Sequence, residues 1–179
     1  MIAIASLMNL EANQQIKEIW DLFETKCNMS EIKQTSLPHF TWQSAEDYRF
    51  ESIEDTLPTL AAQLFPFTVT TAGIGIFTGN TPLIYLALVK TKIMMDFHQV
   101  LWNGLTHSGV AINQHYSPDR WIPHITLAIR DVNSQNLACA LDGILHRPYE
   151  MEILIDNLAV IYQVENYDGV KVKYNFPSG

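Results

Sequence analysis

The sequence predicts an α+β fold made of two pseudo-symmetric lobes, each with a mostly antiparallel sheet flanked by helices, and with a cleft between the lobes. Two observations support this prediction. Short runs of alternating apolar and polar residues take turns with longer runs in which apolar residues recur at helical spacing. Strand-like and helix-like runs also follow a similar order in the two halves of the chain, which is typical of a repeated α+β unit.

The predicted elements are separated by short connections. Pro58 interrupts one helical pattern, and because an interior proline costs about 3 kcal/mol we expect that helix to break there or to begin near Thr56. Gly73 and Gly75 lie inside a strand-like run and indicate a bend or a close backbone approach. The predicted helices cover residues 11–26, 51–64, 92–107 and 134–146, and the predicted strands cover residues 2–8, 36–43, 66–78, 82–90, 122–130, 150–155, 157–165 and 170–175.

The composition narrows the class of protein. The chain has 179 residues, of which 47% are hydrophobic and 17% charged, as in a globular domain with a sizeable core. We expect residues 1–179 to form a single domain of two similar lobes. The net charge of −8, with only 11 lysines and arginines, argues against long nucleic acid, which is bound through many phosphate contacts. A small anion held by a few donors remains compatible with this charge.

No segment is expected to enter a membrane. The N-terminal apolar run is short and lacks a basic segment before it, so it is predicted as a first strand and not as a signal peptide. No run approaches the roughly 18 apolar residues that a membrane helix needs. Cys27 and Cys139 form no motif, so the simplest expectation is a reduced, cytoplasmic protein with two plain thiols. The oligomeric state stays open.

The main functional signal is a motif that occurs twice. Residues 38–42 (PHFTW) and 123–127 (PHITL) both read proline, histidine, apolar, threonine, apolar. A His-x-Thr or His-x-Ser triplet is common by chance, and residues 115–117 contain one, but they lack the proline and the strand pattern. Residues two apart on a strand point to the same face. We therefore expect both strands to present their polar residues to one site, namely His39, Thr41, His124 and Thr126.

These motifs resemble the two-histidine (2H) phosphoesterase superfamily, which includes bacterial 2′-5′ RNA ligase-like proteins and 2′,3′-cyclic nucleotide phosphodiesterases. Residues 116–127, with the pattern Tyr-x-Pro-x-x-Trp-x-Pro-His-x-Thr-Leu, are especially similar, as is the run of residues 66–77. The resemblance extends over essentially the whole chain in the order of elements. It implies an enzyme of RNA processing that acts on cyclic nucleotides or RNA ends, with hydrolysis favoured over ligation. The chain has no triphosphate-binding loop, so ATP-dependent ligation is not supported.

Two histidines and two threonines suit the opening of a 2′,3′-cyclic phosphate. An imidazole with a pKa near 6.5 can act as base or acid at neutral pH, so one histidine could activate water and the other protonate the leaving ribose oxygen. The hydroxyls of Thr41 and Thr126 could donate hydrogen bonds to the phosphoryl oxygens. The sequence does not assign base and acid to His39 and His124. No metal ion and no other cofactor is expected.

Further residues are candidates for substrate binding. Strand alternation places Gln43 on the face of the first His–Thr pair and Ala128 and Arg130 on that of the second, whereas Trp42 is expected in the core. Arg130 could contact a phosphate, although an exposed strand-end arginine is the commoner case. Aromatic side chains near the motifs could stack a nucleobase or could simply pack in the core. They are Tyr116, Trp121 and Phe77, with Tyr162 as a weaker candidate.

Three functions remain open at this point. The leading one is a metal-independent phosphodiesterase whose partner is a small cyclic phosphate, a nucleotide or an RNA end. The alternatives are a nucleotide- or RNA-end-binding module with weak or lost catalysis, or 2′-5′ RNA ligase-like activity on the same fold. A metal held by the two motif histidines is least favoured, because neither motif contains an accompanying carboxylate or cysteine. His98 and His107 have no metal-binding spacing, and no function is assigned to them.

Overall fold

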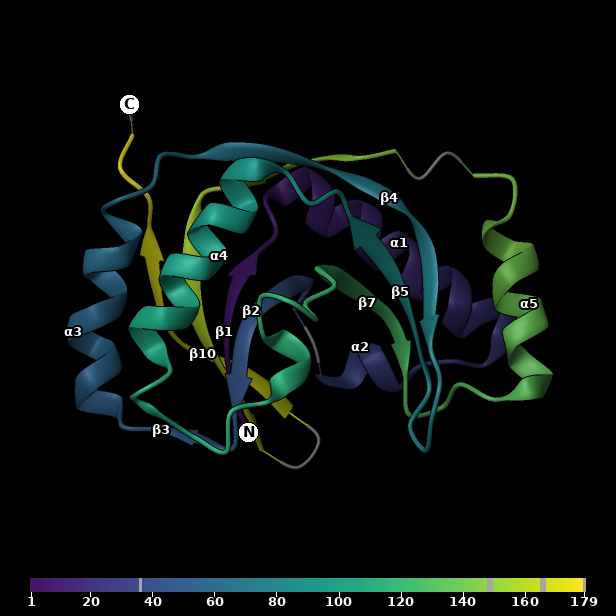
Figure 1. Cartoon of the computed structure of the whole chain (residues 1–179). Coiled ribbons are helices and arrows are strands. Elements are labelled where there is room, and N and C mark those ends of the chain that lie inside the picture. Colours follow the sequence, from purple (N-terminus) through teal and green to yellow (C-terminus); the bar gives the residue numbers. More distant parts are fainter. Residues whose placement is uncertain (36, 148–149, 165–166, 179) are drawn as a thin grey trace.

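The computed structural model describes residues 1–35, 37–147, 150–164 and 167–178. It has an α+β fold in which one eight-stranded antiparallel sheet is flanked by helices (Figure 1), as the alternation of elements predicts. A separate short pair consists of β3 (Asp47–Tyr48) and β6 (Gly109–Val110). The strands of the large sheet, in spatial order, are β10 (Tyr167–Asn175), β9 (Asn157–Val164), β1 (Ile2–Leu7), β2 (His39–Ala45), β7 (His124–Ile129), β5 (Leu83–Leu88), β4 (Phe67–Phe77) and β8 (Glu152–Ile155).

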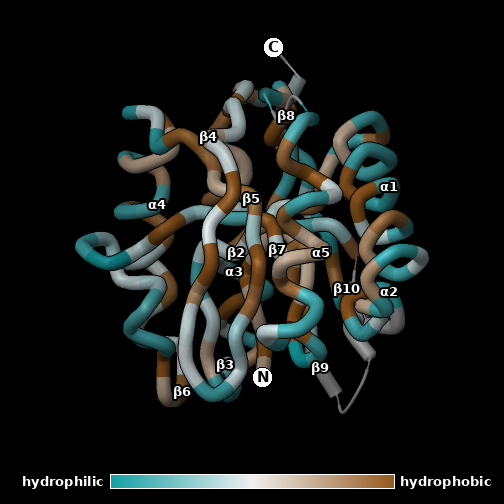
Figure 2. The backbone as a smooth tube through the Cα atoms, turned by 90° about the vertical axis from the view of Figure 1, so that its right-hand side faces the viewer, coloured by the Kyte–Doolittle hydropathy of each residue, from teal (hydrophilic) through white to brown (hydrophobic). Residues whose placement is uncertain are grey.

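The helices lie on two sides of the molecule in Figure 1, with α3 and α4 on one side and α1, α2 and α5 on the other. The four predicted helices are present within a few residues of their expected ends, whereas α2 and the 3₁₀ turn η1 are not predicted. Figure 2 shows that hydrophobic residues gather toward the sheet and hydrophilic residues toward the outer turns of α4. The helical elements are α1 (Leu10–Cys27), α2 (Glu31–Thr35), α3 (Phe50–Ala61), α4 (Lys92–Leu105), η1 (Gln114–Tyr116) and α5 (Ser134–Ile144).

The two motif strands are neighbours at the centre of the sheet. β2 and β7 are joined by a single residue pair, Phe40 with Ile125, the two residues that follow the motif histidines. The strands on the β7 side of this pair come from residues 67–155, and the strands on the β2 side come from residues 2–45 and 157–175. The expected division into two lobes is not confirmed, because the strands on both sides of the β2–β7 pair belong to one sheet.

The core lies between the sheet and the helices. Phe40, Trp42, Ile125 and Leu127 are all fully buried, so the apolar members of both motifs occupy the face that alternation predicts. Helix α1 packs against β7 and α5, and α4 packs against β2 and α3. Each motif strand therefore has a long helix behind it, and these helices supply side chains to the site described below.

The expected break at Pro58 is wrong, because α3 runs without interruption from Phe50 to Ala61 with this proline inside it. Proline removes the hydrogen bond that residue 58 would donate to the carbonyl of Glu54. Both Pro58 and Glu54 lie on the exposed face of the helix, so water can solvate that carbonyl. The cost of the proline is therefore lower than in a buried helix.

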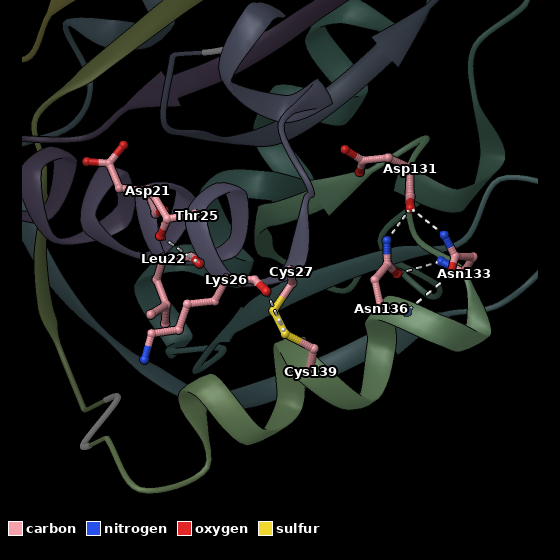
Figure 3. The surroundings of a disulfide bond; sticks show 9 residues. All are labelled: Asp21, Leu22, Thr25, Lys26, Cys27, Asp131, Asn133, Asn136 and Cys139. Atoms are coloured by element: carbon pink, nitrogen blue, oxygen red, sulfur yellow. Dashed lines mark hydrogen bonds between the residues drawn. A yellow bond between two sulfur atoms is a disulfide. The ribbon is translucent and has the colours of Figure 1, made fainter.

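Two cysteines that were expected to be separate thiols form a disulfide (Figure 3). Cys27, the last residue of α1, is bonded to Cys139 of α5, with 5.7 Å between their Cα atoms. The residues are 112 positions apart, and only the packing of α1 against α5 brings them together. The small number of cysteines therefore gives no support to the expected cytoplasmic location. Among the described helices, none is long and apolar enough to cross a membrane.

Candidate active site

The four polar motif residues lie around one cavity. His39 and Thr41 of β2 and His124 and Thr126 of β7 line a space of about 210 Å³, called the motif cavity below. The two strands begin side by side at the centre of the sheet, so the residues that are 85 positions apart in the sequence become close neighbours in space. The cavity extends over β1 and β9, where Ala3 and Ile161 line it.

The backbone holds both motif imidazoles in the same way. Nδ1 of His39 lies 2.7 Å from the carbonyl oxygen of Leu37, and Nδ1 of His124 lies 2.7 Å from that of Ile122. A carbonyl oxygen can only accept a hydrogen bond, so Nδ1 carries a hydrogen in both rings. Nε2 is therefore the nitrogen that gains or loses a proton, and the carbonyl two residues upstream fixes the ring orientation.

Each motif strand contains an irregularity immediately after its threonine. Ala5 of β1 pairs with Thr41 and Ile4 pairs with Gln43, which leaves Trp42 as an extra residue. Tyr85 of β5 pairs with Thr126 and Ile84 pairs with Ala128, which leaves Leu127 as an extra residue. An extra residue of this kind shifts the alternation of side chains by one position. Accordingly Ser44 and Ile129, and not Gln43 and Ala128, line the motif cavity.

Two tryptophans bind the backbone of the motif threonines. The indole Nε1 of Trp121 donates to the carbonyl oxygen of Thr41 at 3.0 Å, and that of Trp20 donates to the carbonyl oxygen of Thr126 at 3.3 Å. Trp121 is only 1% exposed and is stacked between Trp42 and His98, with ring centroids 5.2 and 3.8 Å away. Other rings therefore cover both faces of Trp121, which holds the first motif strand and also lines a second space next to the motif cavity.

His98 lies behind this tryptophan on α4. It is 2% exposed, and its Nε2 lies 2.9 Å from the carbonyl oxygen of Trp42. Its ring also makes a hydrogen bond to the backbone of Tyr116. Burial lowers the pKa of His98 to about 4, so the ring is neutral at neutral pH. The imidazole thus connects β2, which contains Thr41, to the turn η1, whose Tyr116 contacts Thr41.

The second histidine is enclosed by aromatic rings. Phe77 and Tyr85 stack on each other with centroids 4.3 Å apart, and their rings lie 5.0 and 5.2 Å from that of His124. Gly75 makes room for this cluster, because a Cβ atom there would lie 2.2 Å from Cζ of Tyr85. Burial lowers the pKa of His124, opposed by its hydrogen bond to Ile122 and assisted by the nearby charge of His39.

The first His–Thr pair, His39 and Thr41, has a tyrosine hydroxyl beside it. The hydroxyl of Tyr116, in η1, is hydrogen-bonded to the side chain of Thr41. Burial raises the pKa of Tyr116, so its hydroxyl stays protonated at neutral pH. The backbone N–H of Asn113, just before η1, donates to the carbonyl oxygen of Ser44 at 2.9 Å. This bond ties the turn to β2 and keeps Tyr116 beside Thr41.

Comparisons with known proteins identify the family of this chain. Residues 12–166 match the family model described as the 2′-5′ RNA ligase superfamily. The chain belongs to the 2′-5′ RNA ligase superfamily. Proteins named as inferred phosphoesterases from Bacillus mycoides strain KBAB4 and Bacillus cereus strain B4264 are each 26% identical over 132 residues, which is 72% of this chain and of theirs. The superfamily supports a phosphoesterase type of activity.

Solved structures show the same fold. The crystal structure of a protein of Thermus thermophilus superimposes with a TM-score of 0.65 and 15% identity, over 98% of this chain and 97% of that one. A crystal structure described as that of a phosphoesterase gives a TM-score of 0.63 and 15% identity over the same shares. At this identity the likeness concerns the fold alone.

The other candidates for substrate binding are divided between the cavity and the interior. Arg130 lines the motif cavity, but as an exposed residue with φ of 74° after the end of β7 and not as part of the strand. Tyr116 lines this cavity and also a second space of about 470 Å³, the adjoining cavity, which Phe77 lines as well. Gln43 is fully buried, and its side-chain oxygen accepts a hydrogen bond from Tyr48 at 2.9 Å. Tyr162 lies in β9 and is half-buried.

Sequence reasoning missed Ser44, Trp20 and His98. Ser44 was missed because strand alternation alone places it in the core, and the sequence carries no sign of the extra residue before it. Trp20 lies within the predicted helix of residues 11–26 and His98 within that of residues 92–107, and neither residue belongs to a recognisable motif. Their contacts come from helices that pack behind the motif strands, and no local pattern reports such contacts.

The charge of the two cavities is opposite in sign to that of the whole chain. Among the described residues that line them there is no aspartate or glutamate, whereas Arg130 lines the motif cavity and Arg120 lines the adjoining one. The chain itself has a net charge of −8. In the part of the chain that the structure describes, no group of three His, Cys, Asp or Glu side chains is arranged to hold a metal ion. The site therefore has the character of an anion site.

Proposed function

We propose that this protein is a phosphodiesterase that hydrolyses a 2′,3′-cyclic phosphate on a nucleotide or an RNA end, with His39 and His124 as its acid and base. The observation that carries the proposal is the motif cavity itself. It brings together two imidazoles held in the same tautomer, two threonine hydroxyls and one arginine, without a carboxylate among its described lining residues. A phosphate monoanion between the two Nε2 atoms would meet only donors and a proton acceptor.

The surroundings of the histidines suggest which is the base. The pKa of His124 is lowered by burial, so this ring is neutral in the unliganded protein and suits the activation of water. His39 would then supply the proton to the leaving oxygen. In this reaction Nε2 of His124 takes a proton from water, the water oxygen bonds to phosphorus, the bond from phosphorus to a ribose oxygen breaks, and Nε2 of His39 protonates that oxygen.

The remaining cavity residues would stabilise the reacting phosphate. The hydroxyls of Thr41 and Thr126 can donate hydrogen bonds to phosphoryl oxygens, and the guanidinium of Arg130 can neutralise their charge. The adjoining cavity, which shares His124 and Tyr116 with the motif cavity, offers space for the rest of the nucleotide beside the ring of Phe77. The reaction in this form uses no metal ion and no cofactor.

Hydrolysis assays with three alanine variants test this proposal. We expect the wild type to open 2′,3′-cyclic nucleotides, and His39→Ala and His124→Ala each to lower kcat by about 10²- to 10⁴-fold, because each removes a proton-transfer group. His146→Ala is the matched control, since His146 is exposed at the end of α5. Equal activity in the wild type and all three variants would contradict the assignment. Calorimetric binding of a nucleotide without turnover would indicate a binding module instead.

Ligation is a second candidate, favoured by the adjoining cavity, because that cavity shares His124 with the motif cavity. If an RNA 5′-hydroxyl occupied the adjoining cavity, it could take the place of water beside His124 and form a 2′-5′ linkage. Incubation of an RNA that ends in a 2′,3′-cyclic phosphate with a 5′-hydroxyl RNA distinguishes the two reactions. A joined product would favour ligation, and an unjoined RNA with a terminal phosphomonoester would favour hydrolysis.

A further inference from the structure

We propose that Ser44 is a substrate-binding residue whose hydroxyl forms a hydrogen bond with the nucleoside part of the substrate. This proposal rests on the proposed function of the motif cavity and makes it narrower. It implies that the cavity recognises a nucleoside phosphate and does not act equally on any small phosphodiester.

The orientation of Ser44 follows from the register of three strands. Ser44 of β2 pairs with Ala3 of β1, and Ala3 pairs with Ile161 of β9. Residues that lie opposite one another on neighbouring strands share a face of the sheet. All three of these residues line the motif cavity. The side chain of Ser44 therefore faces the same cavity as the motif histidines.

The hydroxyl of Ser44 lacks a partner where one is expected. The residue is 3% exposed, and its Oγ atom makes no hydrogen bond with the residues that the structure describes. A buried hydroxyl without a partner is destabilising, and most buried polar atoms in proteins are satisfied. The Oγ atom is itself buried, so it would meet a ligand after rotation about the Cα–Cβ bond toward the cavity that Ser44 lines, and the ligand would then supply the missing hydrogen bond.

The position along the strand indicates which part of the ligand it meets. Ser44 and Thr41 pair with residues of β1 that are two positions apart, so with a rise of about 3.3 Å per residue Ser44 lies roughly 7 Å from the threonine that would contact the phosphate. That separation exceeds the distance between two oxygens of one phosphate, so Ser44 would meet the sugar next to a bound phosphate. The backbone N–H of Asn113 donates a hydrogen bond to the carbonyl oxygen of Ser44, and Asn113 also lines the motif cavity. Its side chain makes this end of the cavity polar.

The equivalent position of the second motif has no such group. Ile129 lies five residues after His124, as Ser44 lies five residues after His39, and it also lines the motif cavity. One end of the cavity thus offers a hydroxyl, and the other offers an apolar side chain. The nucleoside would be held in one direction across two otherwise similar motifs, with its polar groups toward Ser44.

The test compares Ser44→Ala on two substrates. We expect kcat/KM for a 2′,3′-cyclic nucleotide to fall about tenfold through a higher KM, whereas kcat/KM for ethylene cyclic phosphate, which has no nucleoside, stays within about twofold. Thermal unfolding gives a second readout that separates binding from structure. Since the hydroxyl has no partner among the described residues, Ser44→Ala should unfold at the same or a higher temperature. Ser108→Ala, at another buried serine that lies outside both cavities, is the matched control.

The outcomes are distinguishable from failure of the proposed function. Equal losses on both substrates, or no loss on either, would overturn the role of Ser44, and so would a lower unfolding temperature. If the wild type hydrolyses neither substrate, the proposed function fails. Calorimetric binding of a nucleoside 2′-monophosphate to the wild type and to Ser44→Ala then still decides the role of Ser44, because a binding residue must weaken the complex when its hydroxyl is removed.

Discussion

The two copies of the motif have the same backbone arrangement and different surroundings. In both, Nδ1 bonds the carbonyl two residues upstream, an extra strand residue follows the threonine, and an indole donates to the threonine carbonyl. The first copy has a tyrosine hydroxyl on its threonine, whereas the second has two aromatic rings around its histidine. A repeated backbone thus fixes two imidazoles in place, and the aromatic neighbours of the second copy bury His124, which lowers its pKa.

The largest expected effect tests whether this difference separates acid from base. On a substrate with a p-nitrophenolate leaving group, which departs without a proton, His39→Ala should lose less than about tenfold in kcat. His124→Ala should lose about 10²- to 10⁴-fold on this substrate and on a cyclic nucleotide alike, because water must still be activated. Steady-state assays of both variants on both substrates provide the measurement. If His124→Ala were the variant that kept its activity on the p-nitrophenyl substrate, His39 would be the base and His124 the acid. Equal losses in both variants on this substrate would show that the two histidines do not have separate roles.

The disulfide anchors the helix that contacts the second copy of the motif. Helix α1 ends at Cys27 and also carries Trp20, whose indole donates a hydrogen bond to the carbonyl oxygen of Thr126. Cys27 and Cys139 are 112 residues apart, and a cross-link over a loop of that length stabilises a protein by about 4–5 kcal/mol in the chain-entropy model. We expect a reductant to lower the free energy of unfolding in urea by up to this amount. It should also speed amide exchange in β7 more than in β2.

The double variant Cys27→Ser/Cys139→Ser is the control for this experiment. It should match the reduced wild type and should not respond to the reductant. An unchanged unfolding midpoint of the wild type in reductant would show that the bond does not contribute to stability in solution.

His98, which lies behind the first copy of the motif, should make the stability of the protein depend on pH. Its pKa is lowered to about 4 in the folded protein, against about 6.5 in an unfolded chain. The unfolded state therefore binds more protons below about pH 6.5, and stability should fall as the pH falls from there to about 4, by about 3 kcal/mol in total. Urea unfolding across this range measures the loss. His98→Gln should show a shallower dependence, and an identical one would refute the role of this ring.

The smallest expected effect concerns the aromatic enclosure of the second copy. Gly75→Ala places a methyl group against Tyr85 and should cost about 1–3 kcal/mol of stability, as overpacking does. If Tyr85 moves away from His124, water reaches the ring and the lowered pKa of His124 returns toward its usual value. The acidic limb of the kcat/KM profile should then move to higher pH by less than about one unit. A variant that loses stability without any movement of the limb would show that Tyr85 does not set this pKa.

Local patterns in the sequence were sufficient for most of the elements and for the centre of the site. The motif residues up to the threonine follow strict alternation, so the apolar faces of both motif strands and the burial of Trp42 are as predicted. Gly73, with φ of 104° at an irregular position of β4, and Gly75, beneath Tyr85, show the bend and the close approach that were predicted. These features depend on residues that are close together in the chain, so they can be predicted from short stretches of sequence.

Alternation failed where the strand itself is irregular. Beyond each threonine an extra residue reverses the faces, so Gln43 points into the core and Ser44 into the cavity. The sequence has no mark of this reversal, because the extra residue is defined by the register of β1 and β5 against the motif strands. Register depends on pairing between segments that are distant in the chain.

The sequence by itself determined the two His–Thr pairs, the strands that carry them and the apolar residues beneath them, because these follow from local periodicity. Only the tertiary structure decided that the motif strands are neighbours in one sheet, that Cys27 meets Cys139, and that Trp121 packs as a support for Thr41. It also decided that His124 lies against the rings of Phe77 and Tyr85. These features depend on contacts between residues far apart in the chain, and such contacts are set by how sheet and helices pack together.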